Sequence, residues 1–324
     1  MIAIVGASGF IGSLLVETLF SEQKEPLAID IIKPKTDRNW LIADIADTAS
    51  IERIFFEYSV ETVIHLVGLP QIHLCQKDPH FSYLLNTQSV HNTLEAMRKT
   101  GVQKIVFASS AAVYGTREGT VSEKEATSPI SMYGFHKFVS EELIKAYSIS
   151  YGINFAILRL FNVYGQDPQV GKDVISIFLR QAKNGEQLVV KGKKKYRDFI
   201  HVKDTVKAFA ASTSAQTNNN IINIGTGEKM TLGKLVEMLR EFFPKIKVEY
   251  QHAVDDGEWR EELDRDQSGP HAQDMGGPGH RRQVPDQRER AADAAWRHLH
   301  RRAFVRGRQH DLGGYRRRPD SRDA

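Results

Sequence analysis

The sequence has very little cysteine and no long apolar runs. Cys75 is the single cysteine in 324 residues, which excludes an internal disulfide and a zinc site built from several cysteines. The apolar stretch at residues 61–69 is far shorter than the roughly 20 residues that cross a bilayer. The first residues, MIAIVGASG, have the pattern of a strand and a turn and not of a secretion signal. We therefore expect a cytoplasmic protein without a membrane partner or a metal.

The last part of the chain lacks several residue types that are common before it. Residues 253–324 contain no Lys, Ile, Thr or Asn, whereas residues 1–252 contain 21 Lys and 25 Ile. The basic clusters of the chain come mostly from arginines after Arg281, and the net charge of the whole chain is only +4. We therefore expect no nucleic-acid partner for the folded part.

Strand and helix patterns alternate along the first 165 residues. Strands are predicted at residues 2–5, 27–32, 41–45, 62–67, 104–108 and 155–160, and helices at residues 10–20, 51–58, 81–99 and 139–151. This order predicts an α/β fold with a doubly wound (Rossmann) parallel sheet covered by helices on both faces.

From residue 166 the alternation loosens. Helices are predicted at residues 174–183, 202–211 and 232–243, and strands at residues 221–224 and 247–250. We predict a Rossmann domain at residues 1–165, a smaller α/β substrate lobe at 166–260 and an atypical tail at 261–324.

A glycine-rich turn follows the first predicted strand. Gly6, Gly9 and Gly12 lie in the stretch GASGFIG, where glycine lets the backbone approach a pyrophosphate and the following helix points free N–H groups at it. Asp30 closes the second predicted strand, where a carboxylate accepts hydrogen bonds from a ribose 2′-OH and repels a 2′-phosphate. Together they predict a domain that binds NAD and not NADP. The alternative is that the glycines only pack a turn and Asp30 is a surface acid.

Two further motifs suggest proton transfer. Tyr133 and Lys137 are spaced to share one helix face, and an ammonium beside a phenol lowers a phenol pKa of about 10, which favours Tyr133 as a general base. Ser110 follows the fifth predicted strand, at the edge where open α/β sheets bind ligands, and is placed to hydrogen-bond the same substrate oxygen. The alternatives are an exposed helix pair and a serine that caps a strand end.

In this order the three motifs resemble the extended short-chain dehydrogenase/reductase family, in particular its NAD-dependent nucleotide-sugar epimerases and dehydratases. The UDP-glucose 4-epimerase type is the most similar, and the resemblance covers roughly residues 1–260. The other matching segments are ADIAD at 43–47, HLVG at 65–68, the helix around Asn86, LRLFNVYG at 158–165, YRDFIHVKD at 196–204 and NIGTGEKMTLGKL at 223–235.

The resemblance implies a role for each matching residue. It also implies a homodimer joined by a four-helix bundle, to which each subunit would contribute helices at about 81–99 and 132–151. The catalytic set would be Tyr133, Lys137 and Ser110. The NAD-binding residues would be Gly6, Gly9, Phe10, Ile11, Gly12, Asp30, Asp44, Ile45, Leu66 and Lys137. The nucleotide-sugar substrate would contact Ser110, Tyr133, Asn162 and Arg197. Taken alone, Asn162 also fits a turn residue and Arg197 a surface ion pair.

The residues after Ser110 favour one reaction. The family's 4,6-dehydratases have an Asp-Glu pair there, and its xylose-forming decarboxylases keep the Glu, but this chain has Ala111 and Ala112, which cannot transfer a proton. We therefore expect an enzyme that epimerises UDP-glucose and UDP-galactose at C4 through a 4-keto intermediate. The alternatives are an NAD-dependent reductase or oxidase of a nucleotide sugar, or a catalytically weak NAD-binding regulatory protein.

The family pattern ends near residue 258. Asp255 occupies a position where the resemblance implies an arginine, and the Gly-, Pro- and Arg-rich stretch that follows is typical of disorder, with a short helix predicted at 291–299. One hypothesis is a slipped reading frame near residues 258–270. The other is a genuine Arg-rich tail gained by fusion, which would bind anionic partners. The slip is favoured because Arg and Asp interleave, and resequencing the coding DNA separates the two.

Overall fold

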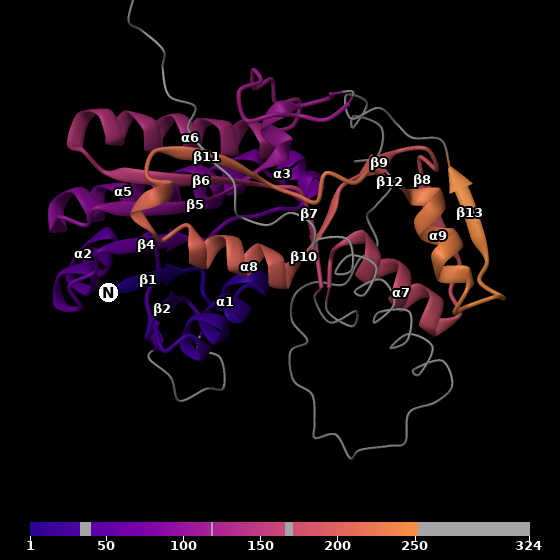
Figure 1. Ribbon diagram of the computed structural model, residues 1–324, viewed down its shortest axis with the longest axis horizontal. Helices are drawn as coiled ribbons and strands as arrows, with labels where there is room; N and C mark the ends of the chain where they lie inside the picture. Colours follow the sequence, from indigo (N-terminus) through magenta and orange to yellow (C-terminus); the bar gives the residue numbers. More distant parts are fainter. Residues whose placement is uncertain (33–39, 118, 166–170, 252–324) are drawn as a thin grey trace, which may run out of the picture.

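Seven parallel strands form the central sheet, in the order β11-β6-β5-β4-β1-β2-β3 (Figure 1). The strands are β1 (Ile2–Val5), β2 (Leu27–Asp30), β3 (Trp40–Ile42), β4 (Thr62–His65), β5 (Lys104–Ser110), β6 (Asn154–Leu160) and β11 (Asn220–Ile224). The computed structural model describes residues 1–32, 40–117, 119–165 and 171–251. The predicted doubly wound parallel sheet is confirmed.

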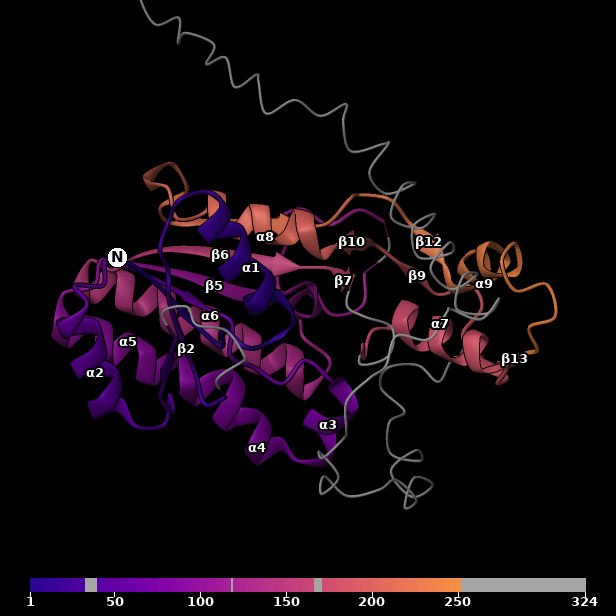
Figure 2. The same ribbon diagram turned by 90° about the horizontal axis from the view of Figure 1, so that it is seen from below.

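Helices cover both faces of the sheet (Figure 2). One face carries α2 (Thr48–Glu57), α5 (Ser89–Thr100) and α6 (Met132–Tyr151), and the other carries α1 (Phe10–Ser21) and α8 (Val202–Ala211). Successive strand residues alternate between these two cores: Ala3 and Val5 of β1 pack on the first face and Ile4 on the second, all at most 2% exposed. Burial on both faces explains why the strands are almost wholly apolar.

The helical segment before α5 differs from the predicted single helix at 81–99. It consists of α4 (Pro79–Tyr83), a π-helical turn, η1 (Leu84–Gln88), and α5, and a short helix, α3 (Ile72–Lys77), precedes it. Ser140 donates a hydrogen bond to the Asn86 carbonyl at 2.7 Å, which satisfies a carbonyl in this irregular turn.

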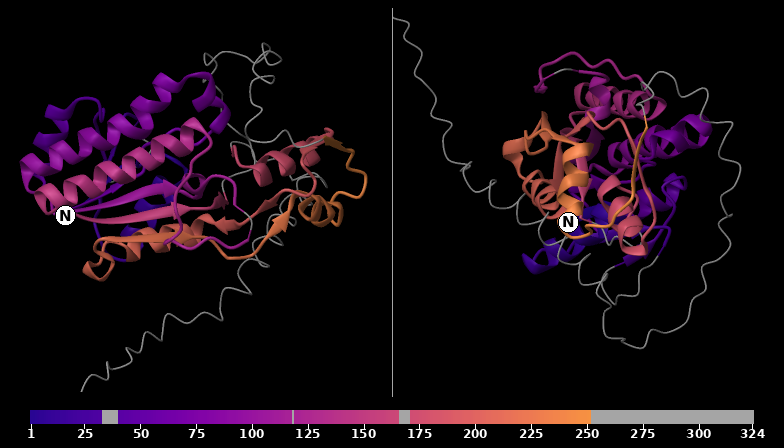
Figure 3. Two further views of the ribbon diagram at one scale, coloured as in Figure 1. Left: turned by 90° about the horizontal axis from the view of Figure 1, so that it is seen from above. Right: turned by 90° about the vertical axis from the view of Figure 1, so that its right-hand side faces the viewer.

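A smaller lobe lies at one end of the molecule (Figure 3, left). It contains α7 (Val174–Asn184), α9 (Leu232–Arg240) and three strand pairs: β8 (Leu188–Lys191) with β13 (Val248–Gln251), β9 (Tyr196–Arg197) with β12 (Met230–Thr231), and β7 (Asn162–Tyr164) with β10 (Phe199–His201). Its own core includes Leu179, Leu188 and Leu235, all fully buried.

The chain returns from this lobe to the central sheet. The strand β11 pairs in parallel with β6, and α8 packs on the sheet beside α1. The predicted division at residue 165 therefore does not separate the strands of the two regions, because β11 and α8 fall in the range given to the substrate lobe.

Among the residues that the structure describes, no helix is long and apolar enough to span a bilayer. The predictions for the segment around Asp255, for the helix at 291–299 and for the origin of the tail lie outside the described residues.

Candidate active site

The glycine-rich turn between β1 and α1 packs tightly against neighbouring segments of the backbone. Gly6 has a φ of +86°, and a Cβ on Gly12 would lie 2.3 Å from the Gly6 carbonyl oxygen. These two positions therefore require glycine. Phe10 and Ile11 open α1, whose first turn contains no acidic side chain, so its free N–H groups form a site for an anion. A cavity of about 270 Å³ lies here, lined in part by Gly9 and by Gly165.

The carboxyl end of β2 lies beside this turn. Asp30 accepts hydrogen bonds from the Ser8 backbone N–H at 2.9 Å and from the Ile31 N–H at 2.7 Å, which fixes the carboxylate at the sheet edge. The Asp30 carbonyl also accepts from the Ala43 N–H at 3.0 Å, which ties the end of β3 to it.

The remaining predicted NAD contacts lie at the same edge. Asp44 is exposed just after β3, Ile45 is buried with its carbonyl bonded to Asn92, and Leu66 follows β4, within 2.9 Å of the position of a Gly6 Cβ. The glycine turn, the fixed Asp30 carboxylate and this apolar edge fit a dinucleotide, and the role of each single residue remains a prediction.

A second, larger cavity of about 920 Å³ lies between the sheet edge and the small lobe. All four predicted substrate residues line it: Ser110, Tyr133, Asn162 and Arg197. Ala111 and Ala112 line it as well, in the short 3₁₀-helix η2 (Ala111–Tyr114) that follows β5.

Tyr133 and Lys137 lie near the start of α6, which begins at Met132, as the resemblance implies, and not at residue 139, as the apolar periodicity predicts. The Ser131 hydroxyl caps this helix by accepting from the Gly134 N–H at 3.1 Å. Gly134 packs against the Ala112 carbonyl, where a Cβ would lie 2.6 Å away, so α6 sits directly on η2. This contact brings Tyr133 to the Ser110 side chain.

Burial shifts the pKa of Tyr133 and of Lys137 toward the neutral form of each side chain. Burial raises the pKa of Tyr133 to about 12, and a hydrogen bond with Ser110 acts to lower it. Burial lowers the pKa of Lys137 to about 8. The charge effect of Lys137 on the phenol stays a prediction.

Buried polar residues surround Lys137. Asn86 accepts a hydrogen bond from the Leu69 N–H at 3.0 Å and donates to the Leu69 carbonyl at 3.2 Å. The Cys75 thiol donates to that carbonyl at 3.3 Å, and burial raises the thiol pKa, so Cys75 stays neutral. These contacts fix the loop after β4 that passes in front of Lys137.

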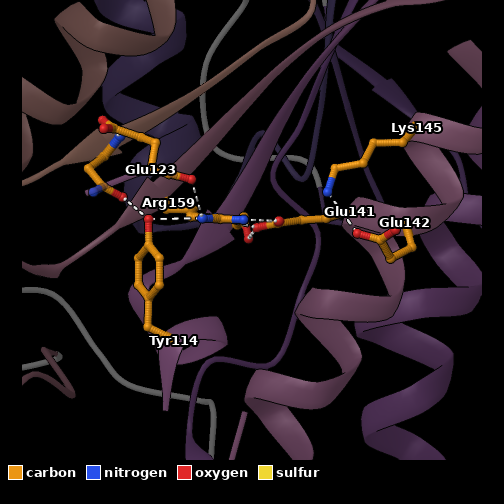
Figure 4. A network of polar contacts seen from close by, with 8 residues as sticks. Tyr114, Glu123, Glu141, Glu142, Lys145 and Arg159 are labelled. Atoms are coloured by element: carbon orange, nitrogen blue, oxygen red, sulfur yellow. Dashed lines mark hydrogen bonds and ion pairs between the residues drawn. The ribbon is translucent and has the colours of Figure 1, made fainter. Parts of the chain in front are cut away.

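A buried ion pair joins α6 to β6 (Figure 4). Arg159 of β6 donates to both carboxylate oxygens of Glu141, at 3.0 and 2.7 Å, and the two side chains are 3% and 0% exposed. Ser109 donates to the same carboxylate at 2.5 Å, and Arg159 also donates to the Tyr114 hydroxyl at 2.9 Å. The pair therefore links β5, β6 and α6.

This ion pair and Asp198 are not among the residues predicted from the sequence. A charged residue within an apolar strand, as Arg159 is in AILRL, indicates a buried partner, and this signal was available. Asp198 accepts from the backbone N–H groups of Thr226 and Gly227, at 2.9 and 2.8 Å, and its carbonyl accepts from the Asn162 side chain at 3.1 Å. It thereby joins three segments at the cavity rim.

Comparison with known proteins agrees with this geometry. The sequence model of the NAD dependent epimerase/dehydratase family matches residues 2–225. The chain belongs to this family. It is therefore related to the nucleotide-sugar epimerases and dehydratases, and it uses NAD.

Three similar proteins illustrate the range of the family. A putative UDP-glucose 4-epimerase of Methanocaldococcus jannaschii is 37% identical over 253 residues, which cover 74% of this chain and 81% of that protein. A dTDP-4-dehydro-6-deoxyglucose reductase of Escherichia coli is 30% identical over 254 residues, covering 74% of this chain and 80% of the other. The crystal structure of UDP-glucose 4-epimerase from Thermotoga maritima with UDP-glucose has a TM-score of 0.71 and 29% identity, covering 78% and 86% of the two chains.

Proposed function

We propose that this protein epimerises a UDP-hexose at C4, interconverting UDP-glucose and UDP-galactose through a 4-keto intermediate. The observation that carries the proposal is the lining of the 920 Å³ cavity, where Ser110 and Tyr133 lie beside Ala111 and Ala112. The cavity thus contains a phenol and a hydroxyl, whereas Ala111 and Ala112 offer neither the acid nor the base that elimination of water requires. The relatives that act on UDP-glucose support the choice of substrate.

The chain's own residues perform the proton transfers. NAD, held at the glycine turn and Asp30, supplies the hydride acceptor and donor. Tyr133 takes the proton of the C4 hydroxyl and later returns it, while Ser110 hydrogen-bonds the same oxygen. Because burial holds the Tyr133 pKa near 12, the phenolate needs further positive charge once the ligands are bound. Lys137, Asn162 and Arg197 would bind the nicotinamide ribose and the diphosphate of the substrate, as the family motifs imply.

A reductase that acts on a nucleotide-bound sugar is the second candidate, favoured by the similarity to the E. coli reductase. The two activities differ in their balance of cofactor. An epimerase forms no net NADH, because the hydride returns to the sugar, whereas a reductase consumes one NADH for each turnover. A UDP-4-keto-hexose supplied with NADH separates them, because only a reductase consumes the added NADH at each turnover, whereas only an epimerase converts UDP-galactose to UDP-glucose without added NADH.

A homodimer is part of the proposal. The outer surfaces of α4 and α6 expose large apolar side chains, including Phe81 (47%) and Phe135 (48%), and Tyr151 (55%) at the far end of α6. Such side chains are typical of a subunit interface. Light scattering after gel filtration measures the mass, and Phe135→Asp should produce monomers.

The proposed cytoplasmic location is tested by imaging a tagged chain.

The substitution Tyr133→Phe tests the mechanism. It removes the phenol hydroxyl that lines the cavity, so interconversion of UDP-galactose and UDP-glucose should fall below detection while NAD remains bound. The matched control is Tyr147→Phe on the same helix, because the Tyr147 hydroxyl bonds Glu95 at 2.6 Å and does not line the cavity. Turnover at the wild-type rate in Tyr133→Phe would refute the proposed role.

A further inference from the structure

A loop at residues 119–130, called here the rim loop, forms one wall of the substrate cavity. Gly119, Val121 and Ile130 of this loop line the cavity, and the loop contains no helix or strand. A segment without its own secondary structure keeps its position only through contacts with the rest of the protein. The shape of this wall therefore depends on what binds the rim loop.

Asn223 of β11 makes three of the contacts that hold this wall. Its side-chain amide donates to the Val121 carbonyl at 3.0 Å, and its backbone N–H donates to the Glu123 carboxylate at 2.9 Å. Its side-chain oxygen accepts from the Tyr114 hydroxyl at 2.8 Å. One asparagine thus joins the rim loop to a second residue that lines the cavity.

The buried ion pair supports Tyr114 (Figure 4), and Tyr114 in turn donates to Asn223. Asn223 pairs in register with Arg159 across β11 and β6, and the Tyr114 hydroxyl accepts from Arg159 at 2.9 Å. The Arg159 guanidinium lies 4.7 Å from the centroid of the Tyr114 ring, so the ring is held by stacking as well. The network therefore leads from Glu141 to the rim loop.

Asn223 does not itself line the cavity. We propose that it is a positioning residue, which holds the rim loop and Tyr114 against the bound substrate and thereby sets the affinity for the nucleotide sugar. The identity of that substrate rests on the proposed function. The loop has other attachments, since Arg117 donates to the Ala126 carbonyl at 3.0 Å and Ser128 to the Val113 carbonyl at 2.9 Å. Loss of Asn223 should therefore shift the loop without unfolding the domain.

The substitution Asn223→Ala removes both side-chain contacts and keeps the backbone bond to Glu123. Amide hydrogen exchange should become about tenfold faster within residues 119–130 and stay unchanged in α6. With UDP-galactose as the substrate, KM should rise about fivefold, as expected for two lost neutral hydrogen bonds, with kcat unchanged. A residue needed only for folding would instead change exchange throughout the sheet.

Two further variants make the test specific. Asn220→Ala, at the exposed start of the same strand, should change neither exchange nor KM. Tyr114→Phe combined with Asn223→Ala should raise KM by less than the product of the two single effects, because both remove the same hydrogen bond. Multiplicative effects would overturn the proposed link through Tyr114.

The outcome for Asn223 is separate from the outcome for the enzyme. Unchanged exchange in the rim loop of Asn223→Ala, or a lower kcat at constant KM, would overturn the positioning role. If the wild type does not interconvert UDP-glucose and UDP-galactose, the proposed function fails. Hydrogen exchange and the Kd for UDP then still decide the role of Asn223.

Discussion

The Lys137 ammonium lies over the ring of Phe107, with Nζ 4.8 Å from the ring centroid. Lys137 is 4% exposed and Phe107 fully buried, so the charge faces an aromatic surface and not water. Burial lowers the pKa of Lys137 from 10.5 to about 8, although Glu141 on the next turn of α6 acts to raise it. Burial of the charged lysine therefore lowers the stability of the folded protein, a pattern that is common at functional sites.

The first prediction concerns Lys137→Met. Between pH 8 and 10.5 the unfolded chain binds a proton that the folded chain does not, so the stability of the wild type rises with pH in this range. At pH 7 the apolar variant should be more stable than the wild type, by up to about 3 kcal/mol, and the difference should shrink by pH 10. Urea unfolding at both pH values measures this. A variant that is less stable at pH 7 would contradict the prediction.

The second prediction concerns acid. Burial lowers the pKa of His65 from 6.5 to about 3, and its ring nitrogens contact Thr93 and Ser89 at 3.0 and 3.3 Å. The unfolded chain gains a proton at His65 as the pH falls below 6.5, whereas the folded chain does not, so stability falls with pH from 6.5 to 3. In His65→Gln the loss of unfolding free energy over this range should be smaller. The exposed His80→Gln should follow the wild type.

The third prediction compares two glycines of the same turn. In Gly12→Ala the new methyl group would lie 2.3 Å from the Gly6 carbonyl oxygen, whereas in Gly9→Ala it would lie 3.4 Å from it, an ordinary contact. Gly12→Ala should therefore lower the affinity for NAD at least tenfold and destabilise the fold by about 2 kcal/mol or more. Gly9→Ala should be close to the wild type in stability. Calorimetric titration with NAD and thermal unfolding measure both effects, and equal behaviour of the two variants would refute the argument.

The fourth prediction compares two neighbouring glutamates on α6 (Figure 4). Glu141→Gln leaves the buried Arg159 without its counter-charge and should cost about 3–5 kcal/mol of stability. Glu142 pairs with Lys145 at 2.7 Å on the surface, where the side chains are 51% and 32% exposed, so Glu142→Gln should cost less than about 1 kcal/mol.

A double variant completes this test. Replacing Glu141 by Leu together with Arg159 by Met removes both charges and should recover much of the lost stability. Failure to recover it would indicate that the hydrogen bonds to Ser109 and Tyr114, and not the unpaired charge, dominate the cost.

The strands of the central sheet were predictable because they are short apolar runs ended by polar residues. The apolar spacing alone did not predict the start of α6, because Gly134 and His136 interrupt that spacing. Both are justified only by tertiary contacts: Gly134 lies against η2, and His136 contacts the Ser82 hydroxyl at 2.8 Å. Tertiary packing therefore outweighs intrinsic helix propensity at this site.

The candidate site divides in the same way. Ser110, Tyr133, Asn162 and Arg197 come from distant parts of the sequence and line one cavity, and their roles toward the substrate stay predictions. The spacing of Tyr133 and Lys137 predicts a charge effect on the phenol but contains no information on burial, which raises the pKa of Tyr133. The positioning contacts of Asn223 depend on strand order, which no local pattern encodes.

The place of β11 at the end of the central sheet has a consequence for synthesis and truncation. During synthesis, β6 can pair with β11 only after the ribosome has added residues 220–224. Until then β6 has a bare edge of unpaired N–H and C=O groups that invites pairing with other chains. A fragment that ends at residue 165 has no β11, so the edge of β6 stays unpaired. We therefore expect this fragment to aggregate.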